Sequence, residues 1–270
     1  VRSNQLFANK EVAAFEKEFG KFNSSKHVKG VGNATQGLHL ALSALAAQKK
    51  AAAGHCYVVG EQTKGRGRLG RQWTSNLGDG LYMSCVLCPD TPAHLLPSLS
   101  FAISLAVYNM LAEQISNDKV KISLKWPNDV LVNGGKIAGI LLEASADGVV
   151  AGCGINLRNA PTDPSQKHPA VSLDQFVARH APVSARLLAF RLVHHLAECY
   201  EVWEQKGHYK IIESWQRYCA MIGANVHIET PHGLVTGRCT SIGGDGELIL
   251  QDDAGREISI TAGDVEIMKV

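Results

Sequence analysis

Residues 61–73 read EQTKGRGRLGRQW, and the rest of the chain is organised around this stretch. It places the cations Lys64, Arg66, Arg68 and Arg71 close together, and glycines separate them. Like charges this close repel one another unless an anion lies among them, and arginine suits planar anions such as carboxylate and phosphate. Glycine lets the backbone approach a ligand closely. The stretch therefore predicts a flexible lid that orders over a small anionic ligand.

Two other interpretations of the basic stretch are a solvated surface loop and an arginine-glycine segment that binds RNA. The stretch lies between two apolar runs typical of strands, residues 57–59 and 81–83, which favours a lid set between core elements. The 27 Lys and Arg against 25 Asp and Glu give a formal net charge of +2. A charge this small provides no overall field that would gather nucleic acid, so any anion binding must be local.

The composition is that of a globular protein, with 270 residues of which 45% are hydrophobic, enough for one large and one small unit. Seven cysteines, an odd number, indicate reduced thiols and a cytoplasmic location. Cys85 and Cys88 have redox or zinc spacing, but a strand would point them to opposite faces, so we interpret them as core residues. The apolar window 95–111 contains a proline and several polar residues, which predicts a buried helix and not a membrane span.

Periodicity and turn residues predict an α+β unit followed by a small all-β unit. We expect helices at residues 11–22, 35–50, 96–116, 184–205 and 209–219, and strands at 26–32, 54–62, 81–87, 121–124, 130–132, 136–144 and 149–157. The sequence Asn133-Gly134-Gly135 predicts a hairpin turn between two of these strands. Five short strands are expected at residues 226–228, 234–240, 248–250, 257–260 and 265–268, which is typical of a small barrel.

Two further segments carry polar groups that an ordinary strand does not need. Residues 125–129 read KWPND, where the proline restricts its own φ and the residue before it, so that each side chain is aimed. Lys136 begins an apolar strand in which Gly139, like Gly154 in the next strand, marks a place where something approaches the backbone. The pair His194-His195 is interpreted as structural, because neighbouring helix positions do not face each other.

Four motifs in this order, EQTKGRGRLGRQW, LKWPNDV, KIAGILLE and GCGIN, resemble those of the biotin protein ligases, and the segment ending in ITAGDVEI resembles that family's small C-terminal domain. The resemblance implies a class II synthetase-like catalytic domain at residues 31–220, with a mixed β-sheet and flanking helices. It also implies an SH3-like barrel at residues 221–270 and leaves residues 1–30 as an atypical segment.

The implied reaction forms biotinyl-5′-AMP from biotin and ATP with Mg²⁺. Biotin then passes to a lysine of the biotin carboxyl carrier domain of a biotin-dependent carboxylase. The alternatives kept open are a lipoate or octanoate ligase of the same fold and, less favoured, an RNA-binding module.

The resemblance also implies the site residues. The catalytic residues would be Lys136, Arg68 and Asp129, and the role of Asp129 stays open between holding Mg²⁺ and orienting the incoming amine. Biotin would be held by Ala34, Thr35, Gln36, Gln62, Gly65, Arg66, Gly67, Arg68, Lys136, Gly139 and Gly154. ATP and AMP would be held by Arg66, Arg68, Arg71, Trp73, Asn128, Asp129, Lys136 and Asn156.

One departure concerns the triplet Ala34-Thr35-Gln36, where the family has Ser-Thr-Asn on the ureido ring of biotin. A lost hydrogen bond to a ligand costs roughly 1–3 kcal/mol, so biotin affinity is affected more than reaction type.

Residues 11–45 resemble the opening of sugar aminotransferases that use pyridoxal phosphate, and Val1 suggests a trimmed start. We expect a form without an N-terminal DNA-binding domain and without membrane attachment, either monomeric or homodimeric. We also expect the acceptor domain to dock by pairing sheet edges near the active site.

Overall fold

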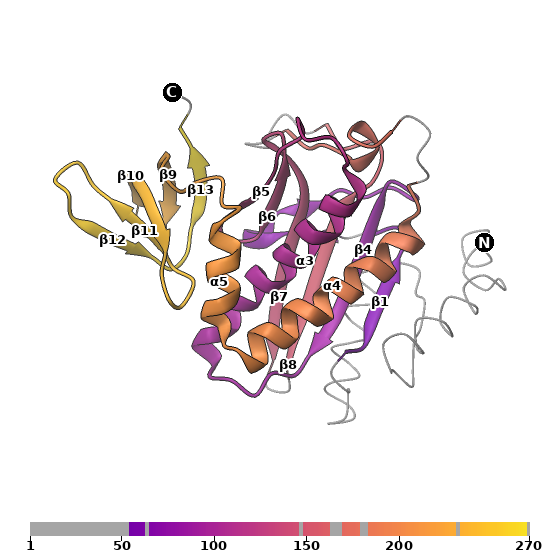
Figure 1. The fold of residues 1–270 in the computed structure, drawn as a ribbon, viewed down its shortest axis with the longest axis horizontal. Helices are drawn as coiled ribbons and strands as arrows, with labels where there is room; N and C mark the ends of the chain where they lie inside the picture. The colour runs from indigo at the N-terminus through magenta and orange to yellow at the C-terminus, as the bar shows by residue number, and fades with distance from the viewer. Residues whose placement is uncertain are drawn as a thin grey trace.

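The structure, a computed structural model, describes residues 54–62, 65–145, 148–162, 169–178, 183–230 and 233–268. A six-stranded sheet is covered on one face by three helices, and a five-stranded sheet lies beside it (Figure 1). The elements predicted within residues 11–50 lie outside the described residues, as does the triplet Ala34, Thr35 and Gln36. The α+β class is confirmed.

The larger sheet has the strand order β1-β4-β8-β7-β6-β5, and its neighbouring strands pair antiparallel. Its strands are β1 (Cys56–Val59), β4 (Gly80–Leu87), β5 (Ile122–Lys125), β6 (Asp129–Val132), β7 (Gly135–Ser145) and β8 (Gly148–Asn156). Parallel pairing occurs at two single bridges, from Leu124 to Cys219 and from Lys136 to Ala170. The predicted hairpin is confirmed: β6 and β7 are joined by Asn133 and Gly134, both at positive φ.

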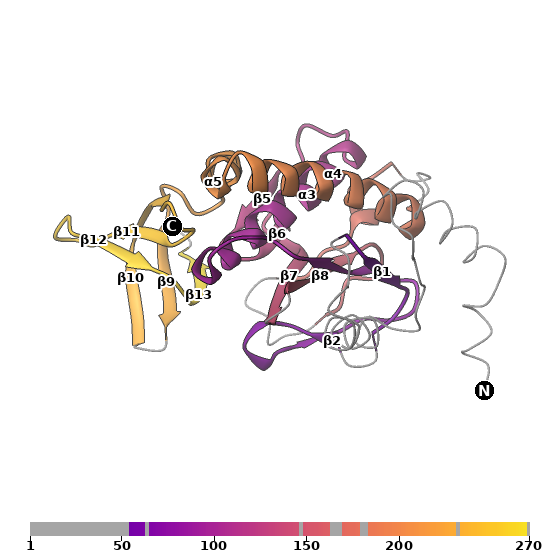
Figure 2. The same cartoon turned by 90° about the horizontal axis from the view of Figure 1, so that it is seen from below.

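The helices lie on one face of this sheet, and the segment around β2 lies on the opposite face (Figure 2). They are α3 (Leu99–Gln114), preceded by the 3-10 turn η2 (Ala93–Ser98), α4 (Ala185–Gln205) and α5 (His208–Gln216). A further 3-10 turn, η3, spans Leu173–Gln175. The segment Ala93–Gln114 is long and apolar enough to cross a membrane, but 67% of its most apolar window is buried. The predicted buried helix is thus confirmed, because α3 packs between the sheet and the other two helices.

The second sheet has the antiparallel order β12-β11-β10-β9-β13. Its strands are β9 (Asn225–Thr230), β10 (Gly233–Ile242), β11 (Leu248–Gln251), β12 (Glu257–Ile260) and β13 (Asp264–Ile267). Its buried side chains, Val226 and Leu250 among them, belong to the same hydrophobic core as the large sheet. The Trp126 indole Nε1 donates a 2.8 Å hydrogen bond to the Gly246 carbonyl, so the KWPND segment is tied to this second sheet.

The cysteines and histidines take structural positions. Cys85 is buried in β4, and Cys88 is half-buried just beyond it. His195 contacts Glu113 and Glu198, and His194 also contacts Glu198. Within the part of the chain that the structure describes, no group of three or more His, Cys, Asp and Glu is arranged to hold a metal ion.

Candidate active site

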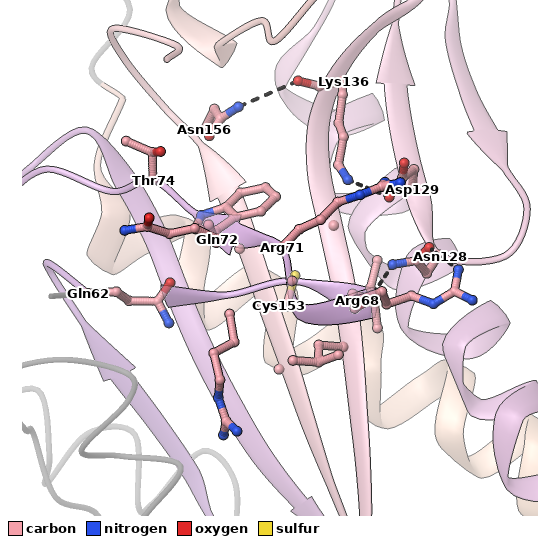
Figure 3. Close-up of a pocket in the computed structure, with 18 of the residues that line it drawn as sticks. Gln62, Arg68, Arg71, Gln72, Thr74, Asn128, Asp129, Lys136, Cys153 and Asn156 are labelled. Atoms are coloured by element: carbon pink, nitrogen blue, oxygen red, sulfur yellow. Dashed lines mark hydrogen bonds and ion pairs between the residues drawn. The ribbon is translucent and has the colours of Figure 1, made fainter. Parts of the chain in front are cut away.

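A pocket of about 510 Å³ lies between the basic stretch and the face of the large sheet that the helices leave open. Arg68 and Arg71 point toward the side that holds Asn128 and Asp129, whereas Gln62 lies on the opposite side (Figure 3). The pocket collects twelve of the predicted site residues: Gln62, Arg66, Gly67, Arg68, Arg71, Trp73, Asn128, Asp129, Lys136, Gly139, Gly154 and Asn156. Gly65, also predicted, lies in the adjoining strand and is buried.

The basic stretch forms a short hairpin, which we call the lid hairpin and define as residues 65–73. It comprises β2 (Gly65–Arg66), the 3-10 turn η1 (Arg68–Gly70) and β3 (Gln72–Trp73). The Gly67 amide donates a 2.7 Å hydrogen bond to the Arg71 carbonyl, which closes the hairpin. A Cβ at Gly65 would lie 2.3 Å from the Trp73 carbonyl oxygen, so this position requires glycine. The backbone is thereby held while the arginine side chains project from it.

The floor of the pocket is a glycine pair on which the Trp73 ring lies. Gly139 of β7 and Gly154 of β8 are directly opposite each other in the sheet. A Cβ at Gly154 would lie 2.8 Å from the Trp73 ring, and one at Gly139 would lie 3.1 Å from it. Trp73 Nε1 is buried without a hydrogen-bond partner in the described part of the chain. The aromatic ring predicted on the nucleotide side therefore lies against the glycines predicted on the biotin side.

Two lid arginines contact groups on neighbouring strands. Arg66 forms an ion pair of 3.0 Å with Glu143 of β7. Arg68 Nη1 donates a 3.1 Å hydrogen bond to Asn128 Oδ1, and the Asn128 amide in turn donates to the Ile140 carbonyl at 2.7 Å. Burial lowers the pKa of Arg68, although Asp129 and Asp264 act against this shift. The Asn128 contact thus fixes the arginine that the sequence places in catalysis.

The third lid arginine, Arg71, is paired with Asp264 at the start of β13. The hydrogen bond that Arg71 donates to this carboxylate raises the pKa of Arg71. Asp264 also lines the pocket, so the second sheet contributes to its wall. No local sequence signal marks this pair, because its members are separated by 193 residues.

Lys136 and Asp129 form the ion pair at the centre of the pocket, with 2.7 Å between Nζ and Oδ1. Lys136 Nζ also lies 5.5 Å from the centre of the Trp73 ring. Apart from this ion pair, the buried oxygen Asp129 Oδ1 has no hydrogen-bond partner among the described residues. Asn156, predicted on the nucleotide side, donates a 3.2 Å hydrogen bond to the Val171 carbonyl at the edge of the pocket.

Lys125 is a pocket residue that the sequence did not assign to the site. The exposed fraction of Lys125 is 3%, and the residue lines the pocket. Burial lowers the pKa of Lys125, Asp129 and Asp264 raise it, and Lys136 and Arg71 lower it again. A lysine at the end of an otherwise apolar strand, 122–125, was the signal that could have identified it.

The other lining residues were not assigned to the site from sequence, although several of them lie within the quoted motifs: Leu69, Gln72, Thr74, Met83, Ser84, Ile140, Leu141, Glu143, Gly152, Cys153, Pro161, Ala170 and Asp264. Taken together, the pocket offers an apolar floor, three acids (Asp129, Glu143 and Asp264) and five cations. This arrangement suits a reaction in which negative charge moves on a phosphate or carboxylate.

Comparison with protein families gives three matches along the chain. Residues 35–158 match the biotin/lipoate A/B protein ligase family, and residues 221–268 match the biotin protein ligase C-terminal domain. Residues 1–53 match the DegT/DnrJ/EryC1/StrS aminotransferase family and lie outside the described residues. The aminotransferase resemblance predicted for residues 11–45 is therefore confirmed.

Individual relatives agree with the first two matches. A biotin–[acetyl-CoA-carboxylase] ligase of Mycobacterium tuberculosis is 36% identical over 210 residues, which are 77% of each chain. A bifunctional ligase/repressor of Bacillus subtilis is 32% identical over 82% of this chain and 68% of its own length. The solved biotin protein ligase of Aquifex aeolicus, in complex with biotin and ATP, superposes with a TM-score of 0.74 and 25% identity, over 89% of this chain and 97% of that one.

Proposed function

This chain belongs to the biotin protein ligase family, and we propose that it carries out the family's reaction in the pocket beneath the lid hairpin. The protein is an ATP-dependent ligase that forms biotinyl-5′-AMP from biotin and ATP and transfers the biotin to a carboxylase carrier. The observation that carries the local assignment is the convergence of Arg68, Lys136 and Asp129 on one pocket with an apolar floor.

In the first step, a carboxylate oxygen of biotin attacks the α-phosphorus of ATP. The bond between this phosphorus and the bridging oxygen breaks, and pyrophosphate leaves with the electron pair. Lys136 and Arg68 lie where negative charge gathers on the phosphate, and fixed cations aimed at developing charge are the largest catalytic contribution in such sites. Lys136 must exchange part of its contact with Asp129 for the substrate anion.

The pocket also fits a magnesium ion. Asp129 Oδ1 is buried and makes no hydrogen bond with the described residues, but it lies 2.7 Å from Lys136 Nζ, so a metal ion here would share the carboxylate with that ammonium. Mg²⁺ in nucleotide sites is held by one or two carboxylates together with phosphate oxygens and water, and the other two pocket acids, Glu143 and Asp264, pair with lid arginines. When bound, Mg²⁺ would neutralise charge on the phosphates. Asp129 is the residue proposed to hold it.

Biotin is proposed to lie over Gly139 and Gly154, with Gln62 at the far side of the pocket from the catalytic pair. The floor admits a ring system because neither glycine has a side chain; the Trp73 indole covers it in this structure, so biotin would displace the indole from it. The adenylate would then extend toward Asn128 and Arg71. Closing of the lid hairpin would shield the acyl-phosphate anhydride from water.

The second step joins the acyl group to a lysine of the carrier domain, with AMP as the leaving group. The incoming amine must be neutral to attack, and Asp129 is the acid positioned to orient it. We further propose that the protein acts in the cytoplasm, as a monomer or homodimer, and that the carrier docks along a sheet edge near the pocket.

One assay tests the function: exchange of labelled pyrophosphate into ATP, measured with biotin, lipoate or octanoate as the only acid. Biotin-dependent exchange is expected, followed by biotinylation of a purified carrier domain. Exchange that is supported by lipoate or octanoate and not by biotin would replace this proposal with the alternative ligase of the same fold. A salt-dependent RNA mobility shift without any adenylation would instead favour the RNA-binding interpretation.

A further inference from the structure

Lys125 is a buried cation without a hydrogen-bond or ion-pair partner among the residues that the structure describes. The exposed fraction of Lys125 is 3%, yet the residue lines the pocket. By contrast, Arg66, Arg68, Arg71 and Lys136 each contact an acid or an amide oxygen. The Lys125 ammonium makes no hydrogen bond or ion pair with any residue that the structure describes.

An ammonium in this position is costly for the fold. Removing a charge from water without pairing it is strongly unfavourable, so buried lysines are normally paired. Lys125 nevertheless lines an anion-binding pocket, where a ligand can supply the missing partner. We infer that the charge is kept for a substrate and not for the fold.

The register of the sheet shows which part of the substrate Lys125 can reach. Gly154 is paired with Gly139, Gly139 with Asp129, and Asp129 with Lys125. These four residues form one row across the strands, and directly paired residues project from the same face of a sheet. Neighbouring strands lie about 4.8 Å apart, so Lys125 lies about 10 Å from the Gly139 floor.

The row therefore runs from the apolar floor, through the catalytic acid, to Lys125 at the edge strand β5. Once the α-phosphate is beside Lys136 and Asp129, a group that extends away from the floor ends at Lys125. The adenosine is uncharged, whereas the leaving pyrophosphate carries most of the negative charge, so the buried ammonium matches the pyrophosphate. We propose that Lys125 binds the terminal phosphates of ATP and stabilises pyrophosphate as it leaves, an assignment that rests on the proposed function.

If Lys125 binds pyrophosphate, its loss should affect the two half-reactions differently. Formation of the adenylate breaks the bond from the α-phosphorus to the bridging oxygen. Lys125 stabilises the negative charge that develops on this oxygen, which leaves as part of pyrophosphate. Biotinyl-5′-AMP no longer contains these phosphates. A residue that acts on pyrophosphate must therefore affect adenylation while leaving the transfer from preformed adenylate unchanged.

The test compares Lys125→Met with wild type in three measurements on the full chain. Pyrophosphate exchange should show a KM for ATP raised about 10- to 100-fold, the loss expected for one charged contact, with the KM for biotin unchanged. Single-turnover transfer from synthetic biotinyl-5′-AMP to the carrier domain should keep the wild-type rate. Lys125→Arg, which restores the charge, should recover part of the exchange.

The third measurement is thermal unfolding without ligands. The Lys125→Met midpoint should equal or exceed that of wild type, because the substitution removes an unpaired buried charge. Equal losses in both half-reactions, or a lowered midpoint, would show a structural role and overturn the inference. An unchanged KM for ATP would overturn it as well. Absence of biotin-dependent exchange in wild type would instead overturn the proposed function itself.

Discussion

Replacing Gly154 by alanine is expected to lift the Trp73 ring from the pocket floor. The added Cβ would lie 2.8 Å from the indole, closer than carbon atoms can pack, and the obstacle is a rigid ring with no flexible end. Inserting a methyl group into a filled site costs typically 1–3 kcal/mol. Gly139→Ala provides a milder case, because its Cβ would lie 3.1 Å from the same ring and 3.2 Å from the Lys136 side chain.

Gly152→Ala is the matched control for the strain at Gly154. Both positions lie in β8, but a Cβ at Gly152 meets its nearest atom at 3.5 Å, an ordinary contact. Alanine in a strand gains about 0.5–1 kcal/mol over glycine, and both variants share this gain. The free energies of unfolding of the two variants should therefore differ by about 1–3 kcal/mol, with Gly154→Ala the less stable.

Urea denaturation measures this difference, and acrylamide quenching of tryptophan fluorescence locates its cause. Trp126, Trp203 and Trp215 are buried, so increased quenching in Gly154→Ala would report mainly on Trp73. The KM for biotin in the exchange assay should rise in Gly154→Ala, because the displaced ring alters the floor. Equal stability and equal quenching in Gly154→Ala and Gly152→Ala would refute the role of the glycine pair.

Three further predictions follow from the same contacts. Lys136→Met is expected to lower biotin-dependent pyrophosphate exchange by about 10²–10³-fold with an unchanged far-UV circular dichroism spectrum, since it removes a charged donor from the phosphate; near-wild-type exchange would exclude Lys136 from the mechanism. Asp264→Asn should change the free energy of unfolding by no more than about 1 kcal/mol, because its pair with Arg71 is largely exposed, yet speed tryptic cleavage at the lid hairpin; unchanged cleavage would contradict the anchoring contact. Because burial lowers the pKa of Lys125, the unfolded chain binds more protons than the folded one between that lowered pKa and the ordinary value of 10.5. Wild type should gain stability as the pH rises through this window, and Lys125→Met should lack the gain; parallel pH profiles would count against the buried charge.

The order of elements from residue 54 onward could be predicted because local chemistry determines it. The two-residue turn at Asn133 and Gly134 needs positive φ at both positions, and the sequence supplies residues that tolerate it. The observed ends of the elements differ from the predicted ones by a few residues. The helix expected at 96–116 begins as a 3-10 turn at Ala93 and becomes α-helical at Leu99. Pro97 lies inside the turn, where a missing backbone N–H is tolerated more easily.

The partners of the site residues could not be predicted in the same way. Glu143 and Asp264 contact lid arginines across 77 and 193 residues of sequence, and although both acids lie in quoted motifs, no local pattern indicates which arginine each one contacts. Likewise, the KWPND motif presents Lys125 as one of three polar residues, and only the packing around it reveals that no residue in the described part of the chain pairs with it. Sequence patterns thus located the pocket, while the balance of charge inside it depended on the tertiary fold.

The hydrogen bond from Trp126 to Gly246 affects how natural variants of this protein should be interpreted. Gly246 lies in a turn of the second sheet, 120 residues beyond Trp126, with φ of 93°, and a Cβ there would lie 2.7 Å from the Phe101 ring. A replacement at this remote turn would push on the Phe101 ring and displace the carbonyl that accepts the hydrogen bond from the Trp126 indole, next to Lys125 in the sequence. Its phenotype would resemble a defect in ATP use, so a clinical or genetic screen that scores only motif positions would misclassify it.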